Sequence, residues 1–339
     1  MKSSAKQRIG SSPGPAKERS IMYKLYPGAI TQVHGIKVGQ VQNEAAKTGV
    51  TLVMAPKEGA IAGVSVRGAA PGTRETDVLK NGNLVEQAHA VLLAGGSAFG
   101  LAAADGVMRH LAQAGIGIDM QVARVPIVPA AVLFDLGVGS ATTYPDAAMG
   151  HAACIAASKE MQQGAVGAGT GATVGKLVHQ AIPHAGGVGT ASLTMPEGIT
   201  VGAVVAVNAM GDIFHPETNE CIASGKMPDG TRVLAEGMLY GQAPALRQMR
   251  IPPPGSNTTI GVVAVDCKLT KAQANRLADV AHDGLARTIR PVHTQMDGDT
   301  MFALATERIP NEINFVKLCA AAAEVTARAV ANAILSQRG

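Results

Sequence analysis

The sequence of 339 residues contains no tryptophan, and aromatic residues make up only 3% of it. Proteins that bind single-stranded nucleic acid without sequence preference stack bases on aromatic side chains, so this composition argues against that class. Charged residues are also few, at 16%, whereas hydrophobic residues account for 47% and glycines number 40. These values are typical of a globular protein with a sizeable core and close backbone packing.

The four cysteines lie far apart and form no CxxC pair. Structural zinc sites and disulfide frameworks usually need closer or regular spacing, so we expect no metal and no disulfide. Gly95 and Gly96 in LAGGSAFG resemble a nucleotide-binding loop, but the GxGxxG spacing is absent there and no basic partner follows, so we expect no nucleotide or flavin cofactor. All four cysteines have apolar neighbours and are expected to be buried reduced thiols: Cys154, Cys221, Cys267 and Cys319.

The net charge of +4 is concentrated in residues 1–20, where five basic side chains face one acidic side chain. Such a Ser/Gly/Pro-bearing segment predicts a basic disordered tail rather than a nucleic-acid groove binder. The tail lacks the apolar core of a secretory signal, and no uninterrupted apolar stretch near 20 residues occurs elsewhere. We therefore expect a cytoplasmic protein without a membrane span, in which residues 21–339 form the folded domain.

The expected elements alternate pairs of strands with blocks of helix, which favours an α+β layered domain over a doubly wound parallel sheet. Ser97 is a plausible N-cap of a helix through Leu111, and Asp146 opens a helix to about Met161. A strand-like run extends from Leu193 towards Val207. Further expected elements are strands at 36–41, 50–54, 212–215, 259–266 and 301–306, a helix at 271–289 with a Thr270/Gln273 capping box, and a helix at 314–336.

The junction Ser256-Asn257-Thr258-Thr259 joins a proline-rich loop, Ala243–Asn257, to the apolar strand that follows. If the bond before Thr258 is cut, the new α-amine has a pKa of about 7.7–8 and lies beside the hydroxyl of its own residue. That amine can take the hydroxyl proton directly or through water, so one residue supplies both nucleophile and base. The alternative is an ordinary turn at the start of a strand.

Seven motifs in order resemble the self-processing P1 peptidase family, which includes DmpA-type aminopeptidases, β-peptidyl aminopeptidases and nylon-oligomer endo-hydrolases. The similarity covers about residues 28–310 and implies an αββα four-layer sandwich of the DmpA/ornithine acetyltransferase-like type. It also implies a precursor that cuts itself into 1–257 and 258–339, with both pieces kept together. The motifs are VRGAAPGTRETD (66–77), LAGGSAFGL (93–101), PAAVLFDLG (129–137), GAGTGATVGK (167–176), VVAVNAMGDI (204–213), NTTIGVVAVD (257–266) and IRPVHTQMDGDTMFALAT (289–306).

The resemblance places autocleavage between Asn257 and Thr258 and makes Thr258 the nucleophile, ahead of its neighbours Thr259 and Ser256. Lys176 matches the family's lysine near the nucleophile, where a cation lowers the pKa of the amine. A phosphate loop is the alternative for this segment, but Thr170 stands where that pattern needs glycine and Leu177 where it needs Ser or Thr.

Three further polar residues complete the catalytic set that the resemblance implies. Asn208 matches an asparagine that donates to the developing oxyanion, and otherwise it is a turn residue. Asp297 and Asp299 are spaced so that both carboxylates can face one site and orient the Thr258 amine and hydroxyl. A turn or a calcium-like loop is the alternative for this pair, but the calcium ligand series stops after two carboxylates.

Tyr144 and Phe134 line the substrate pocket by family analogy, with core packing as the alternative for both. Gly96 and Ser97 belong to a tight strand-to-helix turn that lines the active site. His282 lies within a helix with no partner histidine and is interpreted as structural. His293 lies close to the aspartate pair, but the expected chemistry does not require a histidine.

The aminopeptidase members carry a glutamate that holds the substrate ammonium, and Leu133 stands at that position here, with Asp135 two residues later. A broad amidase or peptidase that accepts short peptides or linear amide oligomers is therefore expected. Family members assemble as tetramers or larger, which predicts a homo-oligomer such as a tetramer of cleaved heterodimers. The rival function is an acyltransferase of the ornithine acetyltransferase type, whose Lys-Gly-x-Gly-Met junction is missing.

Overall fold

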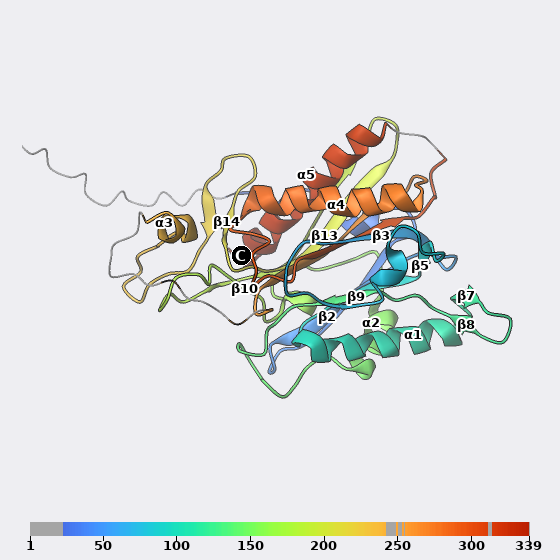
Figure 1. Cartoon of the computed structure of the whole chain (residues 1–339), viewed down its shortest axis with the longest axis horizontal. Helices are drawn as coiled ribbons and strands as arrows, with labels where there is room; N and C mark the ends of the chain where they lie inside the picture. The colour runs from blue at the N-terminus through green and yellow to red at the C-terminus, as the bar shows by residue number, and fades with distance from the viewer. Residues whose placement is uncertain (1–22, 242–248, 250–252, 254, 311–313, 339) are drawn as a thin grey trace, which may run out of the picture.

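The computed structural model describes residues 23–241, 249, 253, 255–310 and 314–338. The fold has four layers, in which two stacked sheets are covered by helices on both outer faces (Figure 1). Helices α4 and α5 cover one outer face, and α1 and α2 cover the other. The predicted αββα sandwich is therefore confirmed. The basic tail and most of the proline-rich loop lie outside the described residues.

The central sheet has six strands in the order β12-β13-β16-β18-β3-β5. All neighbouring strands are antiparallel except β16 and β18, which run parallel. Parallel neighbours need a crossover, and helix α4 supplies it between β16 and β18. The strands are β12 (Gly187–Thr194), β13 (Thr200–Asn208), β16 (Thr258–Val265), β18 (Thr300–Ala305), β3 (Ala60–Val66) and β5 (Gln87–Ala88).

The second sheet has five strands in the order β1-β2-β6-β9-β4. Its strands are β1 (Lys37–Asn43), β2 (Thr48–Met54), β6 (Ala90–Ala94), β9 (Ala130–Val132) and β4 (Gly72–Arg74). Smaller ladders join β10 (Thr173–Val174) to β11 (His184–Ala185), β7 (Ile118–Asp119) to β8 (Arg124–Val125), and β14 (Asp212–Phe214) to both β15 (Cys221–Ala223) and β17 (Ile289–Arg290).

The α-helices are α1 (Ala103–Gln113), α2 (Ala147–Ala156), α3 (Ala235–Leu239), α4 (Lys271–Thr288) and α5 (Phe315–Leu335). Five 3₁₀ helices lie at η1 (Ile30–Gln32), η2 (Asp77–Leu79), η3 (Ser97–Ala102), η4 (Gly167–Gly169) and η5 (Ser336–Arg338). Within the described part of the chain, α5 alone is long and apolar enough to cross a membrane, but 72% of its most apolar window is buried inside the fold. It packs in the core against α4 and β12.

Three layers of apolar side chains hold the sandwich together. One lies between the two sheets, one under α4 and α5, and one under α1 and α2. Alanine, valine and glycine dominate these contacts; Gly189 lies so close to α5 that an added Cβ would meet the Ala329 carbonyl oxygen at 2.0 Å. The four cysteines form no disulfide. Cys154 and Cys267 are buried as predicted, whereas Cys221 and Cys319 are only partly buried.

Several local predictions are confirmed. The Thr270/Gln273 capping box is formed in full at the start of α4. Asp146 caps α2 by accepting the Met149 N–H. The expected strands at 259–266 and 301–306 correspond to β16 and β18 within one residue.

Three local predictions are wrong. Ser97 does not cap a helix, because it has φ +53°, makes no cap hydrogen bond and starts the 3₁₀ turn η3 instead. Helix α2 ends at Ala156 rather than Met161, because Ser158 leaves the helix to pair with Val38 of β1. The run from Leu193 to Val207 is two strands, β12 and β13, joined by a turn at residues 196–198.

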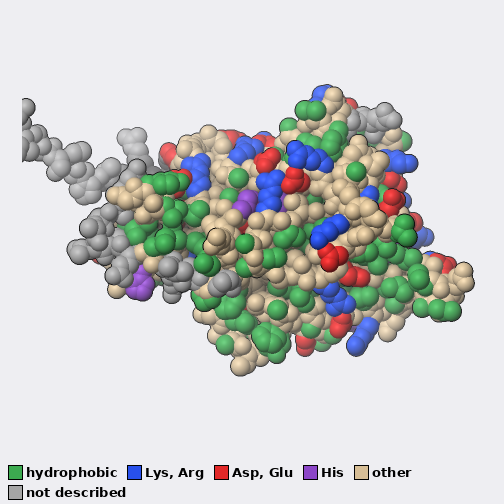
Figure 2. Space-filling view, viewed as in Figure 1, with side chains coloured by type: hydrophobic (Ala, Val, Ile, Leu, Met, Phe, Trp, Pro, Cys, Tyr) green, Lys and Arg blue, Asp and Glu red, His purple; other side chains and the backbone are tan. Residues whose placement is uncertain are grey.

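Charged side chains of both signs are intermixed on the face seen in Figure 2 rather than gathered into a patch of one sign. Several charged side chains among the described residues are paired at hydrogen-bond distance. Arg67 lies 2.6 Å from Asp279, and Arg287 lies 2.8 Å from Glu324.

Asp212 of β14 is a buried carboxyl that should make stability depend on pH. It is 2% exposed and accepts the Ala235 N–H at 2.6 Å, and burial raises its pKa to about 7. Because folding raises this pKa, the stabilisation is complete below about pH 4 and is lost as the pH rises through about 7. We expect Asp212→Asn, which keeps an acceptor oxygen, to gain stability relative to the wild type by on the order of a few kcal/mol between pH 4 and pH 8.

Thermal unfolding midpoints of the wild type and the Asp212→Asn variant at pH 5 and pH 8 check this expectation. The difference between the two proteins should favour the variant more at pH 8. An equal difference at both values would contradict it.

Candidate active site

The predicted catalytic residues gather at one end of the central sheet. Strand β13 ends at Asn208 and β16 begins at Thr258, and these two residues are directly opposite one another in the ladder. Strand β18 begins beside them at Thr300, opposite Val66 at the end of β3. Two strand starts and two strand ends therefore meet here, and the segments just beyond them converge.

Thr258 is 2% exposed. The Thr258 hydroxyl donates to the Asn257 carbonyl oxygen, with Oγ1 and O 2.5 Å apart. The same carbonyl oxygen accepts the Gly298 N–H at 3.0 Å. The hydroxyl thus lies against the carbonyl group of the preceding residue.

Lys176 joins the ends of three segments through its ammonium group. Its Nζ donates to the Asn208 carbonyl at 3.1 Å, to Asn208 Oδ1 at 3.0 Å and to the Ser256 carbonyl at 3.4 Å. The Lys176 ammonium charge therefore lies beside the Ser256 carbonyl, two residues before Thr258. It also lies beside Asn208, which is opposite Thr258 in the ladder. Such a charge favours nearby anions and disfavours protonation of a nearby amine.

Asn208 is fully buried, and its amide is oriented by contacts on both sides. Oδ1 accepts the Thr173 N–H at 3.0 Å as well as the Lys176 ammonium, while Nδ2 donates to the Phe134 carbonyl at 3.1 Å. These contacts fix which end of the amide is oxygen, and the second hydrogen of Nδ2 remains available to another acceptor.

Asp297 and Asp299 are both buried on the segment leading into β18. Asp299 Oδ1 accepts the Thr259 N–H at 2.7 Å, and Asp297 Oδ2 accepts the Thr294 N–H at 2.8 Å. Burial, and then the neighbouring Asp299, raise the pKa of Asp297 to about 6. Asp299 contacts the residue after Thr258, whereas the sequence predicts contacts to Thr258 itself.

The four predicted substrate-binding residues lie on neighbouring loops of the second sheet. Gly96 is packed so closely under Tyr144 that an added Cβ would meet the Tyr144 Cβ at 2.6 Å. Tyr144 is 37% exposed and stacks on Phe99 at 4.6 Å between ring centroids. Ser97 donates its N–H to the Leu133 carbonyl, and Phe134 follows Leu133 with its carbonyl bound to Asn208.

Two residues near Thr258 have no role assigned from the sequence. Gly298 offers its N–H to the Asn257 carbonyl, and an added Cβ would lie 2.8 Å from Thr258 Oγ1 and 2.7 Å from the Ala70 carbonyl oxygen. His293 holds Asp299 through its backbone and its ring. The glycine between two aspartates was a usable signal for Gly298, because only a residue without a side chain fits there.

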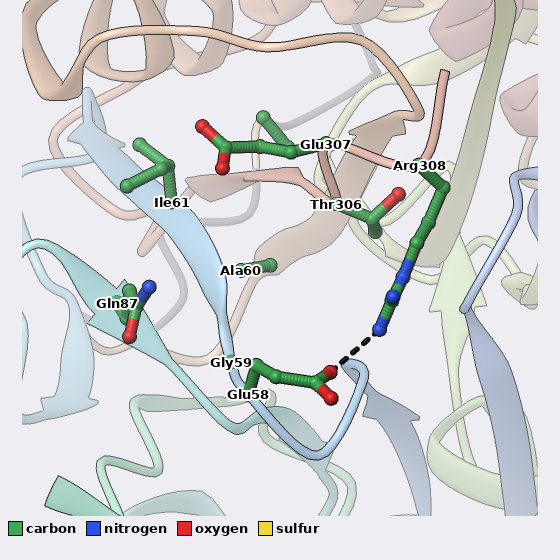
Figure 3. Close-up of a pocket in the computed structure, with 9 residues that line it drawn as sticks. Glu58, Gly59, Ala60, Ile61, Gln87, Thr306, Glu307 and Arg308 are labelled. Atoms are coloured by element: carbon green, nitrogen blue, oxygen red, sulfur yellow. Dashed lines mark hydrogen bonds and ion pairs between the residues drawn. The ribbon is translucent and has the colours of Figure 1, made fainter. Parts of the chain in front are cut away.

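The pocket in Figure 3 lies at the other end of strands β3 and β18, and none of the predicted catalytic residues lines it. Its volume is about 190 Å³, and the ion pair between Glu58 and Arg308, 2.6 Å apart, closes one side. Among the described residues, no group of three or more His, Cys, Asp or Glu side chains is arranged to hold a metal ion.

Comparison with known proteins identifies relatives over nearly the whole chain. An uncharacterised aminopeptidase of Mycobacterium tuberculosis (strain ATCC 25618 / H37Rv) is 44% identical over 337 residues, covering 91% of this chain and 94% of the relative. A 6-aminohexanoate-oligomer endohydrolase of Kocuria sp. (strain KY2) is 32% identical over 276 residues, covering 81% and 74%.

Solved structures share the fold. The L-aminopeptidase D-Ala-esterase/amidase of Ochrobactrum anthropi, described as a variant of the Ntn hydrolase fold, superposes with a TM-score of 0.67 at 20% identity. That superposition covers 93% of this chain and 88% of the other. Peptidase family S58 matches residues 28–338. The chain therefore belongs to peptidase family S58 and is an amide-bond hydrolase with the Ntn-hydrolase fold.

Proposed function

We propose that this enzyme activates itself by cutting the Asn257–Thr258 bond and then hydrolyses amides with Thr258 as an N-terminal nucleophile. The observation that carries the proposal is the contact between the Thr258 hydroxyl and the preceding carbonyl, 2.5 Å from oxygen to oxygen. The Gly298 N–H at 3.0 Å supports it, because a donor already bound to this oxygen would stabilise the negative charge that attack creates.

Self-cleavage would proceed through an ester. Thr258 Oγ1 bonds to the Asn257 carbonyl carbon, the C–N bond breaks, and the hydroxyl proton moves to the departing nitrogen. Water then adds to the ester and releases the Asn257 carboxylate, the Thr258 hydroxyl and its free amine. The bond sits between a loop and a strand held in ladders on both sides, so the geometry at the cut is well defined.

In turnover, the liberated amine would take the hydroxyl proton while Oγ1 attacks the substrate amide. Lys176 would keep a larger fraction of that amine unprotonated near neutral pH, because its charge opposes a second positive charge nearby. Asn208 Nδ2 would donate to the developing oxyanion, since its amide is already oriented by Lys176 and the Phe134 carbonyl.

N-terminal sequencing and intact mass of the purified protein test the proposal. We expect two fragments, residues 1–257 and 258–339, with the smaller one beginning Thr-Thr-Ile-Gly. A fully active preparation whose backbone remains unbroken across this junction would refute it.

For the substrate, we propose short peptides or linear amide oligomers without a strict need for a free terminal amine. Leu133 is fully buried and offers no carboxylate for an ammonium group. Asp135 is 1% exposed and binds the Gly96 N–H at 2.7 Å, so this carboxyl faces inward. The name of the Kocuria relative, an oligomer endohydrolase, supports the same reading.

Rates on aminoacyl-p-nitroanilides and on their N-acetylated forms check this expectation. We expect the ratio of kcat/KM between the free and blocked substrates to stay within about tenfold. One tenfold step is about 1.4 kcal/mol, less than a charged hydrogen bond to the substrate ammonium would contribute. A kcat/KM a thousandfold higher for the free-amine substrate than for the acetylated one would instead show that the enzyme acts as an aminopeptidase.

A further inference from the structure

We propose that His293 is a positioning residue for this reaction, holding Asp299 so that the start of β16, and with it Thr258, stays in place. The inference rests on the proposed role of Thr258 as the nucleophile. It adds His293, which takes no part in the proposed chemical steps. It follows from three observations: how Asp299 is bound, how the backbone of His293 is bent, and what lies behind its ring.

Asp299 accepts three hydrogen bonds, two of which come from His293. Its Oδ2 accepts both the backbone N–H of His293 at 3.1 Å and the ring Nδ1 at 2.8 Å. Its Oδ1 accepts the Thr259 N–H at 2.7 Å. The carboxylate therefore links His293 directly to the residue that follows the nucleophile.

The backbone of His293 adopts a left-handed conformation with φ +56°. A non-glycine residue rarely adopts this conformation, and such strain is retained mainly where the surrounding structure uses it. Here the bend lets one residue present its backbone N–H and its ring nitrogen to the same carboxylate oxygen.

His282 of α4 supports the His293 ring from the other side. The two rings meet edge to face, with centroids 4.8 Å apart. His282 Nε2 is 3.0 Å from the Ser65 carbonyl, and burial lowers the pKa of His282 to about 4, so it is neutral near pH 7 and donates from Nε2. A neutral, fixed ring at this distance limits the orientations that His293 can take.

Loss of the His293 ring would displace Thr258 through the backbone at the start of β16. Without the ring Nδ1 donor, Asp299 would keep only the backbone N–H donors of residue 293 and Thr259, and its carboxylate could turn, which would loosen the contact that holds the start of β16. A displacement of about 1 Å at a reacting atom can cost on the order of 10²-fold in rate. Because the ground-state substrate need not touch His293, we expect the loss in kcat rather than in KM.

The test compares His293→Gly with His293→Asn. Both residues tolerate the left-handed backbone, but only Asn brings a side-chain N–H to the position of Nδ1. We expect the glycine variant to lose about tenfold to 10²-fold in kcat per cleaved enzyme, with KM within about twofold of the wild type. We expect Asn to recover most of that loss, and added imidazole to recover part of it in the glycine variant.

The chain contains a control in a second His–Asp pair, in which Asp266 is buried and His34 is exposed. His34 Nδ1 lies 2.9 Å from Asp266 Oδ2, and Asp266 Oδ1 accepts the Thr200 N–H at 2.8 Å, beyond the far end of β16. His34→Gly should lower the thermal midpoint without lowering kcat. Equal kcat in His293→Gly and the wild type, or no recovery with Asn, overturns the inference, as does an equal kcat loss in His34→Gly. Activity that survives Thr258→Ala would refute the proposed nucleophile instead.

Discussion

Thr258→Ala is expected to yield a single unbroken chain with amide hydrolysis reduced by about 10⁴-fold or more. The substitution removes the hydroxyl oxygen that contacts the Asn257 carbonyl and that would attack the substrate in the proposed mechanism. Removing the nucleophile of a hydrolase that works through a covalent intermediate causes losses of this size. Denaturing gels and initial rates, measured on the same preparation, report the two effects together.

Thr259→Val is the matched control for this experiment. Thr259 is fully buried, and its Oγ1 has no hydrogen-bond partner among the described residues, so a methyl group in its place should cost little. We expect this variant to be cut and active like the wild type. If Thr259→Val instead abolished cleavage while Thr258→Ala did not, the nucleophile would have been assigned one residue too early.

Lys176→Met should lower kcat by at least about a hundredfold, the scale seen when one preorganised donor is removed from an oxyanion site. Loss of the cation also leaves Asn208 without one of its fixing contacts. The acid limb of the kcat/KM profile should move to higher pH, because the Thr258 amine gains a proton more readily without a neighbouring positive charge. The pKa of Asp297, which Lys176 lowers, should rise in the same variant.

Lys271 provides the control lysine. Lys271 is buried, and its Nζ donates to three carbonyls, those of Val78, Asn83 and Val85, at 3.0, 2.6 and 2.6 Å. Lys271→Met should therefore reduce stability while leaving the position of the acid limb unchanged. A lack of any shift in the pH profile of Lys176→Met would show that Lys176 does not act on the amine.

The α+β class could be predicted from the pattern of strands and helices, whereas the order of the layers and the position of the site came from the resemblance of the seven motifs. The apolar run after Thr258 and the capping box at Thr270 fix β16 and the start of α4 from local sequence. Asn208 and Lys176 could be placed near Thr258 through the resemblance, and the ladder brings Asn208 directly opposite Thr258.

The remaining errors came from contacts between distant segments. Ser97 is a residue type that favours the N-cap position. The buried Asp135, however, accepts the Gly96 N–H, and the chain forms a tight 3₁₀ turn before the helix. Helix α2 stops because Ser158 pairs with β1, more than a hundred residues earlier in the chain. His293 lacked a role because its contact with Asp299 depends on a left-handed backbone that single-residue propensities do not indicate.

The order of strands in the central sheet gives the proposed cut an unusual consequence. Strands β16 and β18, which would belong to the short fragment, lie between β13 on one side and β3 on the other, both from the long fragment. Hydrogen-bonded ladders flank the short fragment on both edges, with eight residue pairs to β13 and six to β3. Cutting the bond would therefore create a new chain end while the two strands of the short fragment stay hydrogen-bonded between strands of the long fragment. Dissociation of the fragments would require breaking both ladders of the central sheet.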